Sequence, residues 1–149
     1  MAMTISSSSS SSVRCNNLMI LVLLVLFTSS HYVSAKVAIY TGESLRAGGQ
    51  LIHGAFTLAM QADCNLVLRH SSRVLWSTGT AGKGSNCYVT MQDDGNLVIY
   101  STGKGAVWAS KTVKGKGSYE LVLQDDRNLV IYKRSATARK AIWDTKTYH

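Results

Sequence analysis

The sequence lacks several features that would point to other kinds of protein. Its 149 residues contain no Asn-x-Ser/Thr sequon and no Cys/His cluster with zinc-ligand spacing, so we expect neither N-glycosylation nor a bound metal or cofactor. No helical periodicity longer than one turn occurs after residue 35. The unbroken apolar run at residues 18–27 is about half as long as a membrane-spanning helix, so we expect no membrane insertion.

That apolar run belongs to a segment typical of a secretory signal peptide. A polyserine tract and one positive charge, Arg14, precede it, and a polar stretch ending in Val33, Ser34 and Ala35 follows it. Signal peptidase accepts small residues of this kind, so residues 1–35 are predicted to be a signal peptide cleaved after Ala35. The protein is then secreted, to an extracellular or vacuolar destination, and residues 36–149 form one domain. An uncleaved signal anchor is the alternative.

Three cysteines are present, and Cys15 would leave with the signal peptide. Cys64 and Cys87 remain as an even pair in an oxidising compartment, which predicts one disulfide that closes a short loop. The alternative is two buried free thiols, which export disfavours.

The net charge of +8 could suggest an anionic partner. The basic residues are scattered, however, and only residues 133–140 form a dense cluster. This cluster lies between two apolar strand-like runs, where a solvated loop explains it better than a nucleic-acid contact. We therefore expect no nucleic-acid partner.

A threefold internal repeat dominates the rest of the chain. Three segments align without gaps at a period of 31 to 32 residues, namely residues 56–69, 87–100 and 119–132, here called the first, second and third copies. After each copy come an apolar residue, a tryptophan and small polar residues; the tryptophans are Trp76, Trp108 and Trp143.

Each copy is predicted to form a β-hairpin. In the first copy Phe56, Leu58 and Met60 alternate with Thr57 and Ala59, the period of a half-buried strand, and the other copies repeat this pattern. Asp, Asn and Gly then supply turn chemistry before a short β-rich return strand. The mature chain is therefore predicted to be all-β.

The three copies must share one core, because a two-stranded hairpin is not stable alone in water. Three small antiparallel sheets around an axis would form a three-sided prism. The tryptophans are the natural centre of this core, since each can bury on the order of 200 Å². The alternative is that they act as sugar-stacking platforms, but their apolar neighbours favour the core.

Five side chains of the second copy are expected to share one exposed patch: Gln92, Asp94, Asn96, Val98 and Tyr100. The last three lie at alternate positions of the return strand and so on one face of it. Amide, carboxylate and phenol groups suit sugar hydroxyls, which both donate and accept hydrogen bonds, and valine would contact the C–H surface of the ring. The alternative, that Asp and Asn only build the turn, leaves the other three residues unexplained.

This Gln-x-Asp-x-Asn-x-Val-x-Tyr pattern resembles the mannose-binding signature of the monocot bulb-type lectins. It occurs intact in the second copy and again in the third as Gln124, Asp126, Asn128, Val130 and Tyr132. The first copy keeps Gln61, Asp63, Asn65 and Val67 but has Arg69 in place of tyrosine. With the three tryptophans and the Cys64/Cys87 pair, the resemblance extends over residues 39–147.

The resemblance implies a β-prism II fold with three four-stranded antiparallel sheets and the tryptophans in its core. It implies that Asp and Asn of each motif bind the axial 2-hydroxyl of mannose, Gln the 3-hydroxyl and Tyr the 4-hydroxyl. It also implies mannose-containing glycans as partners, a homodimer or higher homo-oligomer formed by exchange of C-terminal strands, and a role in plant defence.

Other functions fit the residues less well. A glycosidase needs two carboxylates across a cleft, whereas each motif offers one aspartate, and His53 and His70 have no evident Ser or Cys partner. A storage or protein-interaction protein with weakened sugar sites is the alternative function. Arg69 predicts that the first copy is the weakest site, unless its guanidinium instead recruits an acidic or longer glycan.

Overall fold

A computed structural model describes residues 35–149, a part of the chain built from β-strands without a helix. No segment within it is a helix capable of crossing a membrane. Residues 1–34 of the predicted signal peptide, with Cys15, lie outside the described residues. The all-β prediction is confirmed.

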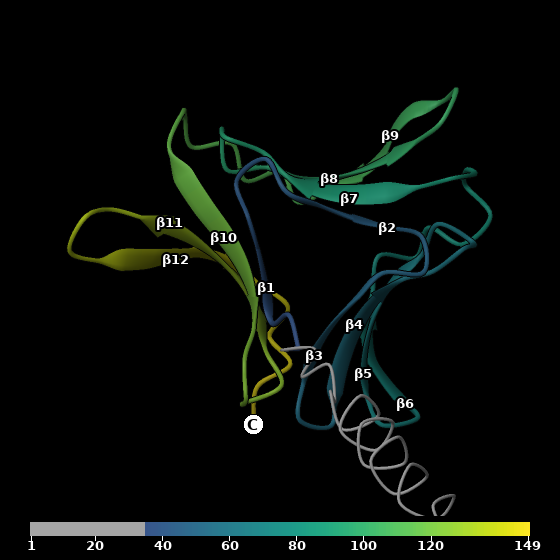
Figure 1. The fold of residues 1–149 in the computed structure, drawn as a ribbon, viewed down its shortest axis with the longest axis horizontal. Coiled ribbons are helices and arrows are strands. Elements are labelled where there is room, and N and C mark those ends of the chain that lie inside the picture. Colours follow the sequence, from purple (N-terminus) through teal and green to yellow (C-terminus); the bar gives the residue numbers. More distant parts are fainter. Residues whose placement is uncertain (1–34) are drawn as a thin grey trace, which may run out of the picture. The chain divides into compact units, whose positions relative to one another are not determined.

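The strands form three four-stranded antiparallel sheets (Figure 1). One sheet contains β3 (Gln50–His53), β4 (Phe56–Met60), β5 (Leu66–His70) and β6 (Arg73–Ser77). Another contains β2 (Ser44–Arg46), β7 (Tyr88–Met91), β8 (Leu97–Ser101) and β9 (Gly105–Ala109). The remaining sheet contains β1 (Ala38–Tyr40), β10 (Ser118–Leu123), β11 (Leu129–Arg134) and β12 (Arg139–Asp144).

Each repeat supplies three strands of its sheet, one more than the predicted hairpin. The additional strands β6, β9 and β12 carry the tryptophans, and a register shift interrupts their pairing with the return strands. The fourth strand of each sheet comes from residues 38–53, so that β1, β2 and β3 extend the sheets of the third, second and first copies. These N-terminal strands have three or four residues, which is too short for alternation to reveal them.

The predicted alternation places the core correctly. Leu58 and Met60 are fully buried, as are their equivalents in β7 and β10, while Phe56 is only partly buried. The return strands add Leu66, Leu97 and similar residues from the same face. The core is therefore formed by aliphatic side chains from all three sheets.

The tryptophans correct one detail of the prediction. Trp76, Trp108 and Trp143 do contact one another edge to face, with ring centroids 5.7–6.4 Å apart. They are only partly buried, however, and pack against the aliphatic core rather than at its centre. Each lies on a strand at the edge of its sheet, where fewer neighbours cover a large ring.

The turn between the first two strands of each copy has one left-handed residue. Cys64, Gly95 and Arg127 occupy this position with φ of 74°, 91° and 78°. Glycine is required in the second copy, because a Cβ on Gly95 would lie 2.7 Å from the ring of Tyr119. The expected tight turn is thus present in all three copies, but only one uses glycine for it.

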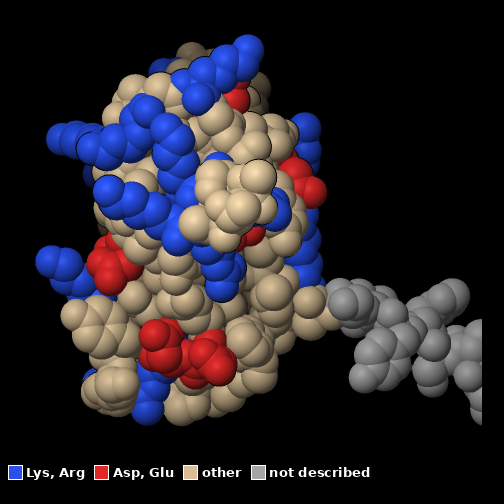
Figure 2. Space-filling model, turned by 90° about the vertical axis from the view of Figure 1, so that its left-hand side faces the viewer, with Lys and Arg blue, Asp and Glu red and all other residues tan. Residues whose placement is uncertain are grey.

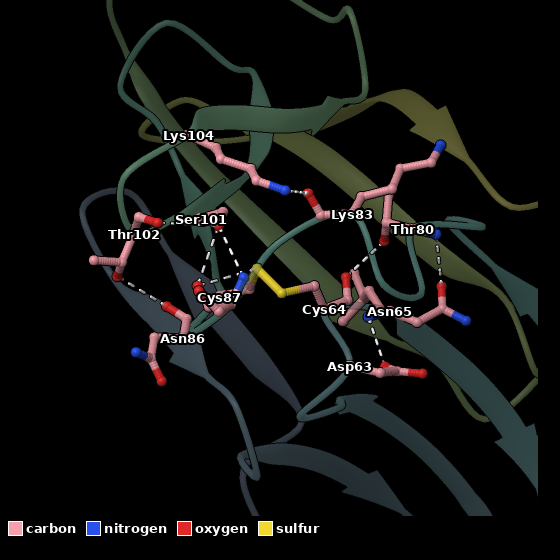
Figure 3. The surroundings of a disulfide bond; sticks show 12 residues. Asp63, Cys64, Asn65, Thr80, Lys83, Asn86, Cys87, Ser101, Thr102 and Lys104 are labelled. Carbon is pink, nitrogen blue, oxygen red and sulfur yellow. Dashed lines mark hydrogen bonds between the residues drawn. A yellow bond between two sulfur atoms is a disulfide. The ribbon is translucent and has the colours of Figure 1, made fainter.

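Cys64 and Cys87 form the predicted disulfide (Figure 3). The bond joins the turn of the first copy to the residue immediately before β7. Both cysteines are almost completely buried. The disulfide therefore adds a covalent link between the sheets of the first and second copies.

Candidate functional site

The motif of the second copy lies around the turn that joins β7 to β8. Asp94 Oδ1 accepts a hydrogen bond from the backbone amide of Asn96 at 2.9 Å, and this bond fixes the turn. Gln92 Nε2 donates to the Tyr100 hydroxyl at 2.9 Å across the strand pair. The structure therefore joins the four polar residues in two hydrogen-bonded pairs on the same hairpin.

A hydroxyl pair that sequence reasoning missed orients each motif asparagine. In the second copy Asn96 Oδ1 accepts hydrogen bonds from Ser110 Oγ at 3.2 Å and from the Thr112 amide at 3.3 Å. The other copies repeat this arrangement with Thr78 and Thr80, and with Thr145 and Thr147. The signal was present in the sequence, since a hydroxyl residue stands two and four positions after every tryptophan. With its oxygen held in this way, each motif asparagine keeps Nδ2 as its remaining side-chain donor.

The motif valines correct the prediction of an exposed apolar contact. Val67, Val98 and Val130 are 2%, 3% and 3% exposed. Each lies on the middle strand of its three-stranded repeat, between two paired neighbours. In the second and third copies the Gln–Tyr hydrogen bond also spans the same face of the strand. The valines therefore form the floor beneath the polar groups rather than part of an open patch.

The third copy has an additional carboxylate. Gln124 Nε2 donates to the Tyr132 hydroxyl at 2.8 Å, as in the second copy. Asn128 Nδ2, however, donates to Asp144 Oδ2 at 3.1 Å. Asp144 is paired in register with the motif valine of the third copy. The residue paired with the motif valine is Ala109 in the second copy and Ser77 in the first. The Nδ2 group of Asn128 is therefore already bonded to a carboxylate within the third copy.

We expect Asp144→Ala to strengthen mannose binding at the third copy. The change frees Asn128 Nδ2 to donate to a sugar hydroxyl, and one hydrogen bond of about 1–1.5 kcal/mol corresponds to roughly tenfold tighter binding. Mannose titration followed by NMR at the Asn128 amide measures this. Ala109→Asp is the reciprocal variant and should weaken the second copy. If binding weakens in Asp144→Ala, the carboxylate is itself a sugar ligand.

The first copy keeps the turn but lacks the Gln–Tyr pair. Asp63 Oδ1 accepts a hydrogen bond from the backbone amide of Asn65 at 2.9 Å, as the equivalent residues do in the other copies. Arg69 donates to the Ser72 carbonyl at 3.4 Å, in the turn before β6. Its guanidinium thus has a local partner away from the motif glutamine, and the first copy retains only half of the arrangement.

Charged side chains are spread over the surface around the sheet of the third copy (Figure 2). The basic cluster at residues 133–140 forms the exposed hairpin between β11 and β12. Glu120 lies within ion-pair distance of both Arg134, at 3.6 Å, and Arg139, at 3.1 Å. Within residues 35–149 no three His, Cys, Asp or Glu side chains group as metal ligands would.

Comparison with known proteins defines the class of this fold. A monomeric monocot mannose-binding lectin from Gastrodia elata is 49% identical, with a TM-score of 0.72 over 76% of this chain and 100% of the other. The snowdrop (Galanthus nivalis) mannose-specific agglutinin, solved with methyl-α-D-mannoside, is 40% identical, with a TM-score of 0.66 over 76% and 99%. The fold is therefore the β-prism II of the bulb-type lectins. The chain belongs to the family of monocot mannose-binding lectins.

The comparison with curated sequences gives the same result over a shorter region. The mannose-specific lectin of Dendrobium findlayanum is 47% identical over 78 residues, which cover 52% of this chain and 47% of that protein. The chain spans about half the length of the curated relatives it matches. No family model matches the sequence.

Proposed function

We propose that this protein is a lectin that binds mannose of glycans, with its principal site at the second copy and without chemical change to the sugar. The observation that supports this most directly is the arrangement of Gln92, Asp94, Asn96 and Tyr100 in two hydrogen-bonded pairs. A relative of the same fold was solved with methyl-α-D-mannoside, and the relatives above are named as lectins rather than enzymes.

The free hydrogen-bonding capacity of these four residues matches vicinal sugar hydroxyls. Asp94 uses Oδ1 within the turn, which leaves Oδ2 to accept from a hydroxyl to which Asn96 Nδ2 donates. Gln92 donates to Tyr100, so the phenol hydrogen and the Gln92 carbonyl oxygen are directed to other partners. We assign the first pair to the 2-hydroxyl of mannose, and Gln92 and Tyr100 to the 3- and 4-hydroxyls.

Retention on mannose–agarose tests this function. Four or five hydrogen bonds of roughly 1 kcal/mol each give an affinity around millimolar for one exposed site. Useful binding therefore requires several sites to engage one clustered glycan. The protein should be retained on the resin and eluted by free mannose, but not by galactose. Failure to be retained at any sugar density would contradict the proposal and favour a storage or protein-interaction role.

The first copy should be the weakest site, and Arg69→Tyr should restore it. The guanidinium donates but cannot accept, and it is bonded to the Ser72 carbonyl. The tyrosine should re-create the hydrogen-bonded pair with Gln61. The one or two hydrogen bonds to mannose gained in this way correspond to about tenfold tighter binding. Mannose-induced NMR shifts at Asp63 and Asn65 should appear in the variant. Shifts in the unmodified first copy as strong as those in the second would contradict this expectation.

We also propose that the protein is secreted and that its mature chain begins at Lys36. The small residues before Lys36 and the short apolar run support this. N-terminal sequencing of the protein purified from its natural tissue should read Lys-Val-Ala-Ile. A start upstream of the apolar run would show that the segment is not a signal peptide. Secretion is consistent with a defence role against organisms that display mannose-rich glycans.

We further propose that the protein forms a homo-oligomer, because two or more protomers present more sugar sites in one particle than one chain does. Within the chain β12 pairs with β11, so an exchange of C-terminal strands would replace this pairing with the same pairing between protomers. Light scattering on the purified protein distinguishes a dimer from a monomer at micromolar concentration.

A further inference from the structure

The hairpin formed by β11 and β12 carries two pairs of like charges. Lys133 lies opposite Lys140 across the two strands, and Arg134 lies opposite Arg139. All four residues are exposed. Like charges in directly opposite positions repel each other and destabilise a sheet. The fold therefore concentrates positive charge in this hairpin at a cost in stability.

This arrangement is specific to the third copy. The strand pair equivalent to the two lysines is Ser101 with Gly105 in the second copy and His70 with Arg73 in the first. Each of those pairs is the last before its turn, whereas the third hairpin is extended by the additional arginine pair. The basic hairpin is therefore not a general feature of the repeat.

The loop between β9 and β10 adds two lysines to this area. Lys133 Nζ donates a hydrogen bond to the Lys114 carbonyl at 3.4 Å. The Tyr119 hydroxyl donates to the Gly115 carbonyl at 2.6 Å, which holds the loop against the beginning of β10. Two separate segments thus form one basic surface. We call the following six exposed residues the basic face: Lys114, Lys116, Lys133, Arg134, Arg139 and Lys140.

One carboxylate accompanies these six cations. Glu120 pairs with both arginines of the basic face and is itself almost completely buried. Within residues 35–149, no carboxylate lies within ion-pair distance of the four lysines. Figure 2 faces the side on which this hairpin projects in Figure 1, and Lys and Arg crowd its upper part. The basic face therefore has a strong excess of positive charge that is open to solvent.

The positive charge lies on both sides of the hairpin. Neighbouring residues of a strand point to opposite faces of the sheet, so the lysine pair and the arginine pair lie on opposite sides. Arg134 and Arg139 contact Glu120 on one side. On the other side Lys133 lies over the Tyr119 ring, 5.7 Å from its centre. A flat membrane surface or a rigid duplex would meet one side only, whereas a flexible chain can contact both.

The tyrosines of this area are poor platforms for nucleotide bases. Their rings already contact cations, with Arg134 over Tyr40 at 5.5 Å and Arg139 over Tyr132 at 4.8 Å from the ring centres. Proteins bind single-stranded nucleic acids through aromatic faces on which the bases stack. The turn at residues 135–138 contains only Ser, Ala and Thr, so it has no large apolar side chain to enter a bilayer. These features disfavour single-stranded nucleic acid and lipid as partners.

We propose that the basic face binds an acidic polysaccharide, a flexible sugar chain with a carboxylate or sulfate on successive units. An anion beside each like-charged pair replaces repulsion by attraction, and the contacts along one chain combine. The Lys114 amide donates to the Asp94 carbonyl at 2.8 Å, so the basic face adjoins the second copy and its proposed sugar site. This position favours a sugar polymer over an acidic peptide. The binding is separate from that of mannose and does not require it.

Biolayer interferometry of the purified protein on immobilised polygalacturonate and dextran sulfate tests the proposal. The protein should bind at least one of these polymers but not neutral dextran, and the polymer bound more tightly identifies the preferred anion. Raising NaCl from about 0.1 to about 1 M shortens the Debye length from about 10 to about 3 Å and should weaken binding about tenfold or more. Saturating methyl α-mannoside should leave this binding unchanged.

Two matched variants locate the binding. Lys133→Gln with Lys140→Gln removes one like-charged pair but leaves the arginines with Glu120, and it should weaken polymer binding about tenfold. Its midpoint of thermal unfolding should not fall, because a repulsion is lost. Lys83→Gln with Lys104→Gln removes the same charge elsewhere, where Lys104 Nζ donates to the Lys83 carbonyl at 3.3 Å (Figure 3). This control should weaken binding by less than about twofold.

The other outcomes overturn the proposal. An equal loss in both variants would show that binding follows the net charge of the protein and not the basic face. Displacement by methyl α-mannoside would assign the polymer to the sugar sites. Tighter binding of duplex DNA, polyglutamate or phosphatidylserine vesicles than of either polysaccharide would contradict the class of partner. Because none of these measurements requires mannose binding, failure of the proposed function and failure of this inference are distinguishable.

Discussion

Replacing Cys64 and Cys87 together by alanine should lower the free energy of unfolding by about 3 kcal/mol. The bond closes a loop with a sequence separation of 23 residues, and the chain-entropy model gives this magnitude for such a loop. For a domain of this size the midpoint of thermal unfolding should fall by roughly 10–20 °C. Urea unfolding followed by tryptophan fluorescence measures the change, because the tryptophan cluster reports on contact between all three sheets.

Two controls isolate the effect of the bond. The unmodified protein in reducing buffer should lose a similar amount of stability, while the double variant should not respond to reductant. Both cysteines are buried, so alanine also removes some packing. If the free energy of unfolding of the double variant is less than 1 kcal/mol below that of the unmodified protein, the disulfide does not contribute the expected stability.

Replacing Asp94 and Asp126 together by alanine should abolish retention on mannose–agarose. Each aspartate is proposed to supply the charged acceptor for one sugar hydroxyl, and losing such a bond costs about 1.5–3 kcal/mol, or roughly 10- to 150-fold per site. A millimolar site then becomes too weak to hold the protein on the resin. Retention and circular dichroism should be measured on the same preparation.

The structure indicates a sharper version of this experiment. Each aspartate also fixes its turn through Oδ1, so alanine removes a turn hydrogen bond as well as a proposed sugar contact. Asparagine can keep the Oδ1 bond while replacing the other carboxylate oxygen. Asp94→Asn with Asp126→Asn should therefore lose retention without loss of stability. Asp125→Asn removes a neighbouring exposed charge and should be retained normally; undiminished retention of the double asparagine variant would place the mannose site elsewhere.

The candidate site shows which features local patterns could predict. The hairpin strands and the turn follow from alternation and from Asp/Asn chemistry, both of which act between residues close in sequence. The contact of Asn128 with Asp144 could not be predicted in this way, because it depends on the register between β11 and β12. The burial of Val98 likewise follows from the two strands that flank β8.

The sequence by itself determined the all-β class, the threefold repeat, the core-facing positions and the identity of the motif residues. The alternation and the motif are written in residue type and spacing within one copy, and the repeat in the period of 31 to 32 residues between copies. The tertiary structure alone decided that the N-terminal strands complete the sheets, that the tryptophans meet at the edge of the core, and that Asp144 bonds the motif asparagine of the third copy. These features depend on which strands become neighbours, and that choice is set by the packing of the three sheets against one another.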